Sequence, residues 1–462
     1  MNMRTDLNAI AAAHAKGVDV KAFLERHPAI AAMDCLFVDV TGAIRGKRVP
    51  RGEIESVFAG GMQMSYSAYF LDARGELTNA GGLGFSDGDP DGTAFPDAAT
   101  LTPVAFADPA RAQVIMTLYE ADGRPTLLDP RQLLASVVER FKELKLTPTV
   151  AVELEFYLVD QARRADGAIQ PPVRPGTQER ETAVAVYGID ELDFYKAFLT
   201  DVRDACALQS VPATTANSEY GPGQFEINLH HTQDAVQAGD QAVYLKQCIR
   251  AAAHRNAMRA TFMSKPYLDR AGNGMHIHIS LVDENGRNVF DDGTLEGSAT
   301  LRHAAAGLGA LMHEGMAIFA PNSNAFRRYA PNLFVPMNRR WGVNNRSTGI
   351  RVPAGPSAAR RIEHRVAGAD ANPYLVLAAV LAGVHHGLTQ RLDPGAPHEG
   401  NAAGDVDGTV PFTMKEAIGA LESGSILKAY FGRYADLYAQ SKRKELARYQ
   451  SVISSHEYDW YL

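Results

Sequence analysis

The chain has 462 residues, 46% of them hydrophobic, which is enough for a large core and for two or three domains. Its formal net charge is −7 and no run of lysines or arginines stands out, which argues against nucleic acid or a membrane surface as a partner. The sequence has no apolar run near the roughly 20 residues that a membrane helix needs. The cysteines Cys35, Cys206 and Cys248 fit no zinc or redox spacing, so we expect reduced core thiols in a cytoplasmic protein.

The N-terminal part has the pattern of a helix followed by a small sheet. A proline at position 28 ends the first helical stretch, and Thr41-Gly42 marks a turn between two apolar runs. A long segment rich in Gly, Asp and Pro then predicts loops. In chain order we predict a helix over 1–30, a hairpin over 33–50, loops over 72–109 and a strand over 113–123.

Asp129-Pro130 is typical of a capped helix start, with proline in the first turn. We therefore place a domain boundary near residue 128, which divides the chain into 1–128 and 129–462. Downstream, strands alternate with helices, as in an α+β or α/β catalytic domain. The helices are expected at 131–145, 190–210, 234–263, 298–318, 372–392 and 413–422.

Four strand-like segments place apolar residues on one face and charged or polar residues on the other. In a strand, residues i and i+2 point the same way, so Val152 and Leu154 oppose Glu153 and Glu155. Four segments with the same pattern predict one sheet whose polar face lines a charged cavity. They are 150-VAVELEFYLV-159, 224-QFEINLHH-231, 274-GMHIHISL-281 and 360-RRIEHRV-366.

These strands and one nearby turn supply candidate metal ligands. Carboxylate oxygens suit hard divalent cations such as Mg²⁺ or Mn²⁺, and one imidazole favours Mn²⁺ slightly. Six ligands are too many for one Mg²⁺, which keeps several waters, so two adjacent ions fit better. The candidates are Glu153, Glu155, Glu219, Glu226, His276 and Glu363.

Arginines cluster in the segment that follows. Arginine keeps its charge and grips carboxylate or phosphate with two parallel hydrogen bonds, so arginines beside divalent metals indicate an anionic substrate such as a nucleotide phosphate chain. The sequence has no GxxxxGK[ST] loop, which excludes a Walker-type ATPase. We interpret Arg339, Arg340 and Arg360 as solvated neighbours. The proposed site arginines are Arg328, Arg346, Arg351, Arg361 and Arg365.

The motifs together resemble those of the glutamine synthetase family. The stretches that carry the resemblance are 153-ELEFYL-158, 272-GNGMHIHISL-281, 344-NNRSTGIRVP-353 and 360-RRIEHRVAGADANPYL-375. The resemblance covers the chain from about residue 33 to its end. It implies an α+β fold, with an N-terminal β-grasp domain and a catalytic domain whose antiparallel β-sheet funnel is flanked by helices. It also implies a homododecamer of two hexameric rings, with active sites between subunits.

The resemblance implies a reaction, the ATP-dependent ligation of L-glutamate to an amine through γ-glutamyl phosphate. By position, the resemblance implies that one ion is bound by Glu155, Glu219 and Glu226, and the other by Glu153, His276 and Glu363. It implies that glutamate is bound by Arg328, Arg365 and the backbone of Gly272, and that the transferred phosphoryl group contacts Arg346. Nucleotide contacts fall to His278, Ser280, Arg351 and Arg361. Arg346, Glu363 and Arg328 are the residues expected to act on the reacting groups.

Two departures from the family pattern bear on the amine. The ammonia-using enzymes carry an Asp in an N-terminal DGSS turn, where this chain reads 60-GGMQMSYSAYF-70, and a Glu in a PGYEAP flap, where it reads 331-PNLFVP-336. Without both carboxylates the site lacks a trap for ammonium, and Phe334 suits a carbon chain better. We therefore expect a ligase resembling the γ-glutamylpolyamine (γ-glutamylputrescine) synthetases of amine catabolism. Phe334, with Met62 to Tyr66 of an adjoining subunit, is the candidate amine pocket.

Two alternatives stay open. One is an ordinary glutamine synthetase that uses ammonia, and the other is a non-catalytic homologue that serves as a sensor or a structural ring. Non-catalytic homologues usually lose metal ligands, whereas all six candidates are present here. The sequence does not identify a carboxylate cluster for the far ammonium of a diamine, so a small monoamine also stays open.

Overall fold

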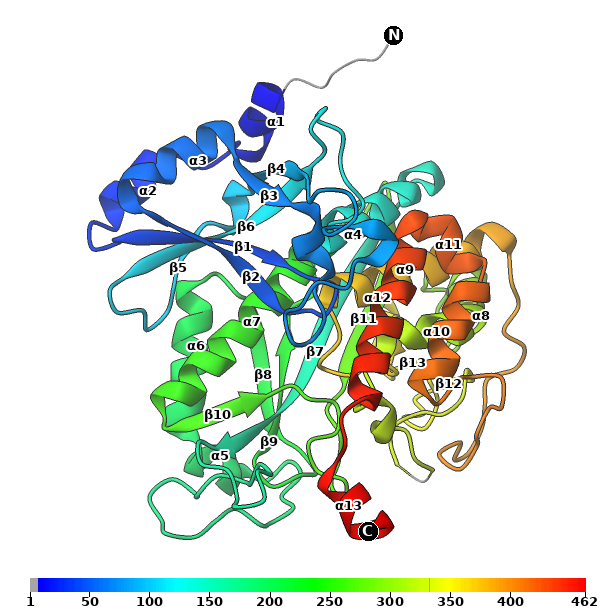
Figure 1. The fold of residues 1–462 in the computed structure, drawn as a ribbon. Coiled ribbons are helices and arrows are strands. Elements are labelled where there is room, and N and C mark those ends of the chain that lie inside the picture. Colours follow the sequence, from blue (N-terminus) through cyan, green and yellow to red (C-terminus); the bar gives the residue numbers. More distant parts are fainter. Residues whose placement is uncertain (1–6, 332) are drawn as a thin grey trace.

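The computed structural model describes residues 7–331 and 333–462. Its described residues form a small N-terminal sheet and a larger sheet, both flanked by helices (Figure 1). The small sheet has the order β2-β1-β6-β4-β3, with β5 also paired to β6. β1 and β6 run parallel and the other pairs are antiparallel. Its strands are β1 (Ala32–Val38), β2 (Ile44–Pro50), β3 (Met62–Ser65), β4 (Asp91–Pro96), β5 (Thr102–Pro103) and β6 (Arg111–Tyr119).

The large sheet has the order β12-β13-β14-β11-β7-β9-β8 in the described chain, with β10 also paired to β7. It is antiparallel except for the parallel pair β12 and β13. Its longest described strand is β7, which has 15 residues and pairs with β9, β10 and β11. The strands are β7 (Leu146–Asp160), β8 (Ala213–Ser218), β9 (Gln224–Leu229), β10 (Met258–Thr261), β11 (Met275–Asp283), β12 (Trp341–Val343), β13 (Ile350–Val352) and β14 (Ile362–His364).

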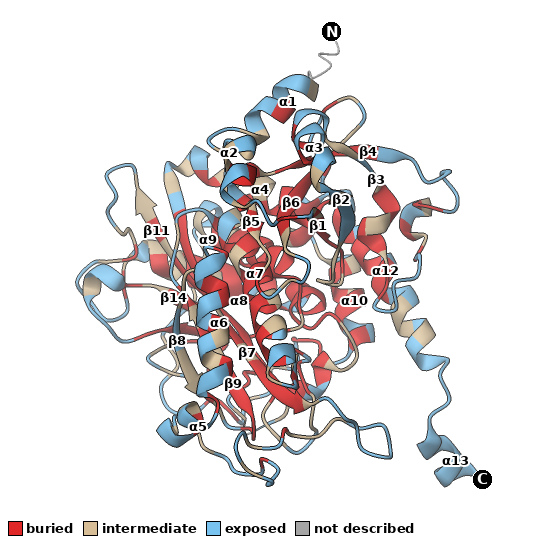
Figure 2. Cartoon of the chain, turned by 90° about the vertical axis from the view of Figure 1, so that its left-hand side faces the viewer, coloured by how far each residue is buried: buried red, intermediate tan, exposed pale blue. Residues whose placement is uncertain are grey.

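Helices cover the apolar sides of both sheets. Val152, Leu154 and Phe156 of β7 are fully buried, and α7 packs against that strand. One hydrophobic cluster contains residues of both sheets, so the two share a core (Figure 2). The helices are α1 (Leu7–His14), α2 (Val20–Arg26), α3 (Ile54–Gly60), α4 (Pro130–Glu139), α5 (Ile189–Phe194), α6 (Lys196–Leu208), α7 (Ala235–Arg255), α8 (Ala299–Phe319), α9 (Pro373–Gln390), α10 (Met414–Ser423), α11 (Ile426–Phe431), α12 (Arg433–Gln450) and α13 (Ser455–Tyr461).

The mixed α+β class and the two-sheet organisation are confirmed, and so is the hairpin β1–β2. Cys35, Cys206 and Cys248 are free and buried, as expected. The chain passes from β6 to α4 between residues 119 and 130, and the exact domain division at 128 stays a prediction. None of the described helices combines the length and apolar character needed to cross a membrane.

Several predicted elements were wrong in extent. The predicted helix over 1–30 begins outside the described residues, and over 7–30 it is two helices, because Gly17 has φ of 85° between them. The helix over 234–263 stops at Arg255, and after Ala257, with φ of 56°, the chain turns into β10. The segment 72–109 contains β4 and β5, which neighbouring strands stabilise despite its loop-like composition. Helices α11 to α13 were not predicted.

A buried arginine joins the small sheet to the catalytic helices. Arg131 of α4 donates from Nε and Nη2 to both oxygens of Asp240 in α7, at 2.9 and 2.8 Å. It also donates to Thr117 of β6 at 2.8 Å and to Asp97, after β4, at 2.6 Å. Tyr374 of α9 donates to Asp240 at 2.7 Å. This network fixes the relative position of the two sheets, and hence the framework of the site.

We predict that Arg131→Ala lowers the free energy of unfolding by about 3–5 kcal/mol, because it leaves the carboxylate of Asp240 buried without a counter-charge. Urea unfolding followed by circular dichroism measures this. Arg124→Ala, which removes an exposed pair with Asp122, is the control and costs less than about 1 kcal/mol. Equal costs for the two variants would contradict the structural role of Arg131.

Candidate active site

The predicted adjacency of the four patterned strands is confirmed, because they lie in the order β14-β11-β7-β9. The register sets the ionisable residues opposite one another across neighbouring strands. His276 faces Glu153, and His278 faces Glu363. Glu155 faces Glu226. Directly opposed residues have Cβ atoms about 5 Å apart, so alternation along each strand collects these side chains on one face.

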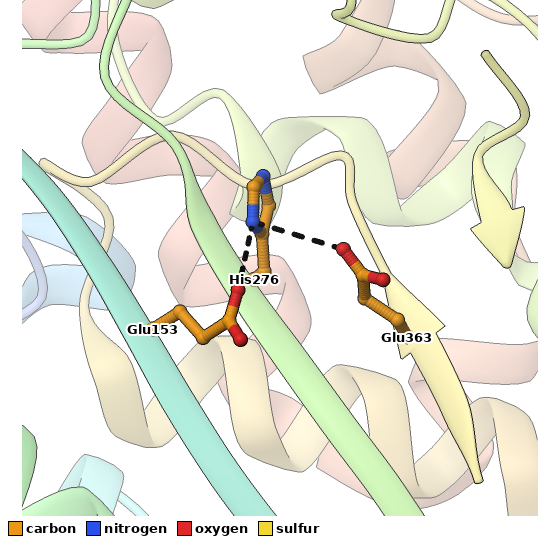
Figure 3. Close-up of side chains that lie close together, drawn as sticks. All are labelled: Glu153, His276 and Glu363. Carbon is orange, nitrogen blue, oxygen red and sulfur yellow. Dashed lines mark hydrogen bonds and ion pairs between the residues drawn. The ribbon is translucent and has the colours of Figure 1, made fainter. Parts of the chain in front are cut away.

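Two groups of ligand atoms converge on this face. One is formed by Glu153, His276 and Glu363, and the other by Glu155, Glu226 and His276. In each group the atoms lie within 4.8 Å of one another. Figure 3 shows the imidazole of His276 between the carboxylates of Glu153 and Glu363, with Nδ1 3.3 Å from the first and 3.9 Å from the second. Its Nε2 lies 3.8 Å from Glu155, so His276 joins the two groups.

Glu219 lies beside these groups and belongs to neither. It follows β8 on a turn, and Asn217 donates a hydrogen bond to it at 2.8 Å. Burial, and then the charge of Glu155, raise its pKa to about 7. Burial and the neighbouring carboxylates, Glu153 and Glu155 first among them, raise the pKa of Glu226 to about 9. The pocket therefore holds more negative charge than its own side chains compensate.

Glu153 lies beside two histidines on this face. Burial opposes its ionisation, but hydrogen bonds from His276 and His278 outweigh burial and lower its pKa. Nε2 of His278 lies 2.8 Å from Glu153, while Nδ1 accepts a hydrogen bond from Arg361 at 3.1 Å.

The donor set fits divalent cations. Carboxylate oxygens with one imidazole are the ligands of Mg²⁺ and Mn²⁺ sites. Opposed like charges such as Glu155 and Glu226 destabilise a sheet when nothing neutralises them. The chemistry of these residues therefore fits divalent cations, with one candidate group of Glu153, His276 and Glu363, a second of Glu155, Glu226 and His276, and Glu219 beside them.

Two arginines hold Glu363 from either side. Arg351 donates to one carboxylate oxygen at 2.7 Å, and Arg365 pairs with the other. Burial opposes ionisation of Glu363, but Arg365 and the two histidines hold its pKa at about 2. Asn344, which the sequence analysis did not single out, accepts from Arg351 at 3.0 Å. Arg351 and Arg365 thus contact the metal face directly. We use this name for the side of the large sheet that carries Glu153, Glu155, Glu226, His276 and Glu363.

Buried arginine donors around this face lack partners. The Nε atoms of Arg328, Arg351 and Arg365 have no hydrogen-bond partner in the described chain, although all three residues are buried. Arg328 uses Nη1 on the carbonyls of Val366 and Ala367, at 2.7 and 3.2 Å. Buried donors are nearly always satisfied, so these unfilled positions indicate an anionic ligand.

Glycines let the backbone approach Arg328. A Cβ on Gly272 would lie 2.8 Å from its Cγ, and one on Gly274 would lie 2.6 Å from its Nη2. A Cβ on Gly272 would also lie 2.6 Å from the backbone carbonyl oxygen of Ser264, so this position needs glycine, whereas the contact at Gly274 is with the movable end of Arg328. Gly274 also donates its N–H to Glu155 at 2.7 Å. The loop before β11 therefore brings Gly272, Arg328 and the metal face together.

A cavity of about 1220 Å³ opens beside the metal face. Its lining includes Glu153, His278, Ser280 and Arg361, so three of the residues expected to meet nucleotide share one wall with a candidate metal ligand. Arg351, the fourth, is not part of this lining and instead contacts Glu363. The cavity is large enough for a nucleotide-sized ligand.

A second cavity, of about 810 Å³, is lined by Phe334 and Arg346 together with residues near 296 and 399. Phe334 is 58% exposed, and its ring lies 6.1 Å from that of Tyr220 between centroids. Tyr220 was missed in the sequence, although it directly follows Glu219. Burial raises the pKa of Glu219, and the charge of Arg346 opposes that rise.

One interpretation of the surface arginines was wrong. Arg360 is only 2% exposed, because it is covered by the turn around Gly297 rather than solvated. Arg339 and Arg340 are exposed and pair with Asp407 and Asp405 at 2.9 and 3.1 Å, as expected of solvated residues.

Comparison with known proteins agrees with this geometry. The family model described as glutamine synthetase, catalytic domain, matches residues 127–461. The chain is 41% identical over 445 residues to gamma-glutamylputrescine synthetase PuuA of Escherichia coli, which covers 96% of this chain and 94% of that protein. It is 31% identical over 454 residues to the glutamate–isopropylamine ligase of a Pseudomonas species, with 96% and 97% covered.

Solved structures give the same result. The GmaS/ADP complex has a TM-score of 0.81 and 27% sequence identity, and covers 96% of this chain and 98% of that one. GmaS without ligand has a TM-score of 0.82 at the same identity. Family, fold and the acidic sheet face lead to one conclusion. The chain belongs to the glutamine synthetase family and is an ATP-dependent glutamate–amine ligase.

Proposed function

We propose that this enzyme ligates L-glutamate to putrescine or a similar polyamine, and forms a γ-glutamylamide, ADP and phosphate. The observation that carries the proposal is the pairing of two converging groups of candidate metal ligands and buried arginines with an aromatic residue, Phe334, in the flap. The similarity to a synthetase named for γ-glutamylputrescine supports the same substrate class.

In the proposed reaction the γ-carboxylate of glutamate attacks the γ-phosphorus of ATP, and ADP leaves. An uncharged amine then attacks the carbonyl of γ-glutamyl phosphate, phosphate leaves, and the amine loses a proton. Arg328 and Arg365 would bind glutamate with the backbone of Gly272, and Arg346 would meet the transferred phosphoryl group. Positioning and neutralising charge suffice for this chemistry.

Two divalent ions, Mg²⁺ or Mn²⁺, complete the proposal, one with Glu153, His276 and Glu363 and the other with Glu155, Glu219 and Glu226. When bound, they would neutralise charge on the phosphates. The first cavity, with His278, Ser280 and Arg361 in its wall, takes the nucleotide. Arg351 would reach the nucleotide from its position on Glu363.

The ammonia-using alternative is less well supported by the residues. Phe334 and Tyr220 offer aromatic surface and no carboxylate, so they favour a carbon chain over ammonium. The non-catalytic alternative is disfavoured because the ligand groups converge.

A cytoplasmic homododecamer of two hexameric rings is part of the proposal. The arm that ends in α13 projects from the body, and Ile453, Trp460 and Tyr461 are 63%, 74% and 80% exposed (Figure 2). Such apolar surface on a terminal arm favours contact with another subunit. In the segment Met62 to Tyr66, on and next to edge strand β3, Met64 and Tyr66 are buried in their own core, so Met62, Gln63 and Ser65 would meet a neighbouring subunit's site. Three buried free thiols fit a reducing compartment.

We predict that phosphate release with ATP and glutamate is fastest with putrescine in a panel that also contains cadaverine, spermidine, ethanolamine, methylamine, isopropylamine, aniline and ammonium. Burial of each CH₂ contributes about 0.8 kcal/mol, so the four CH₂ groups of putrescine contribute about 3 kcal/mol, and kcat/KM for putrescine should exceed that for ammonium by about 200-fold. Efficient turnover at low millimolar ammonium would contradict the assignment of Phe334 to a carbon chain.

We predict that Mg²⁺ raises the Tm more at pH 9 than at pH 6. In the unfolded chain Glu219 and Glu226 ionise at ordinary values, whereas the raised pKa values of about 7 and 9 keep protons on the folded, metal-free protein. The stability of metal-free protein therefore falls as pH rises through this range, and metal binding reverses the loss. Differential scanning fluorimetry with EDTA or Mg²⁺ measures it. A rise in Tm on adding Mg²⁺ that is independent of pH, or smaller at pH 9 than at pH 6, would refute this account.

We predict that Glu219→Ala lowers metal-dependent ATP turnover by at least about 100-fold, because it removes a carboxylate beside the metal groups, and leaves assembly unchanged. Glu179→Gln, at an exposed position, is the control. Steady-state turnover and light scattering report the two properties. A wild-type protein with no turnover to lose would support the non-catalytic alternative.

A further inference from the structure

We propose that the cavity beside Phe334 binds the distal, protonated end of the amine substrate, with Glu296 and Glu399 as its counter-charges. The preferred substrate class is then a primary diamine or polyamine rather than a monoamine. This inference rests on the proposed function, because it extends the same active site outward from the position of the reacting amine.

An exposed aromatic pair connects this cavity to the metal face. Phe334 and Tyr220 are 58% and 47% exposed, and their ring centroids lie 6.1 Å apart. Tyr220 adjoins Glu219 in the chain, and Phe334 lines the cavity. Aromatic faces attract both alkyl chains and ammonium groups. A carbon chain that leaves the metal face would therefore pass along these rings into the cavity.

Unpaired carboxylates lie in the cavity wall. Glu296 and Glu399 both line it, and neither has an ion-pair partner in the described chain. Nearby charges behave differently, because Arg339 pairs with Asp407 and Arg340 with Asp405. Nε2 of His398, in the same wall, is buried without a hydrogen-bond partner among the described residues. The wall thus offers two free negative charges and an unused polar atom.

The charges in the cavity fix the direction in which a diamine binds. Arg346, the residue proposed to meet the transferred phosphoryl group, lines the same cavity. It repels an ammonium group, so the amine nitrogen that reacts there must be neutral, while the charged end is favoured beside Glu296 and Glu399. A monoamine of the same length gains the aromatic contact and nothing from the carboxylates.

The test compares putrescine with n-butylamine in the double variant Glu296→Gln/Glu399→Gln. Two exposed charge contacts are worth about tenfold together, so KM for putrescine should rise by about that factor. KM for n-butylamine and for glutamate should change by less than about twofold. Both positions are exposed, so the variant should fold. Glu179→Gln is the charge-matched control, and it should leave both amines unaffected.

The outcomes separate this inference from the function on which it rests. A wild-type enzyme that turns over no amine would overturn the proposed function itself. A wild-type enzyme that uses putrescine, with an unchanged ratio of putrescine to n-butylamine in the double variant, would overturn only the distal site. Equal losses for both amines would also overturn it, because they would show a general effect on the flap.

Discussion

Repulsion between carboxylates on one face of the large sheet is the constraint on which the rest of the structure depends. The side chains of β7 alternate, so burying Val152 and Leu154 in the core necessarily directs Glu153 and Glu155 to the opposite face. The register then places Glu226 across from Glu155, which adds like charge where the chain is already acidic. Such an arrangement is costly alone, and it becomes favourable when cations occupy the pocket. The core and the site are therefore two sides of one strand pattern.

The residues around the acidic face complement its negative charge. Arginines approach the acidic face from β13, from the residue that follows β14 and from the segment before the flap, and they keep buried donors unfilled. Gly272 and Gly274 allow the backbone to lie against Arg328. The Arg131–Asp240 network holds the small sheet and the helices behind this face in one position. Anion-binding groups thus lie beside cation-binding groups on a rigid frame, which is what ligation of two anions, glutamate and a nucleotide, requires.

The alternation of apolar and charged residues predicted the four strands and their adjacency well, because that pattern is local and its period is 2. The sequence was less informative where contacts between distant segments determine the local structure. Strand β10 forms within a predicted helix because it pairs with β7, and β4 forms in a glycine-rich segment because it pairs with β6. Neither the contact between Tyr220 and Phe334 nor the burial of Arg360 has a local signal, since each depends on segments distant in sequence. The roles of individual site residues, which came from resemblance, stay proposals.

The central claim is that two divalent cations occupy the acidic face. Anomalous X-ray diffraction from crystals soaked in Mn²⁺ tests it most directly, because it locates the ions without reference to activity. The account predicts two peaks per chain, one among Glu153, His276 and Glu363, the other among Glu155, Glu219 and Glu226. A single peak, or ions bound away from this face, would contradict it.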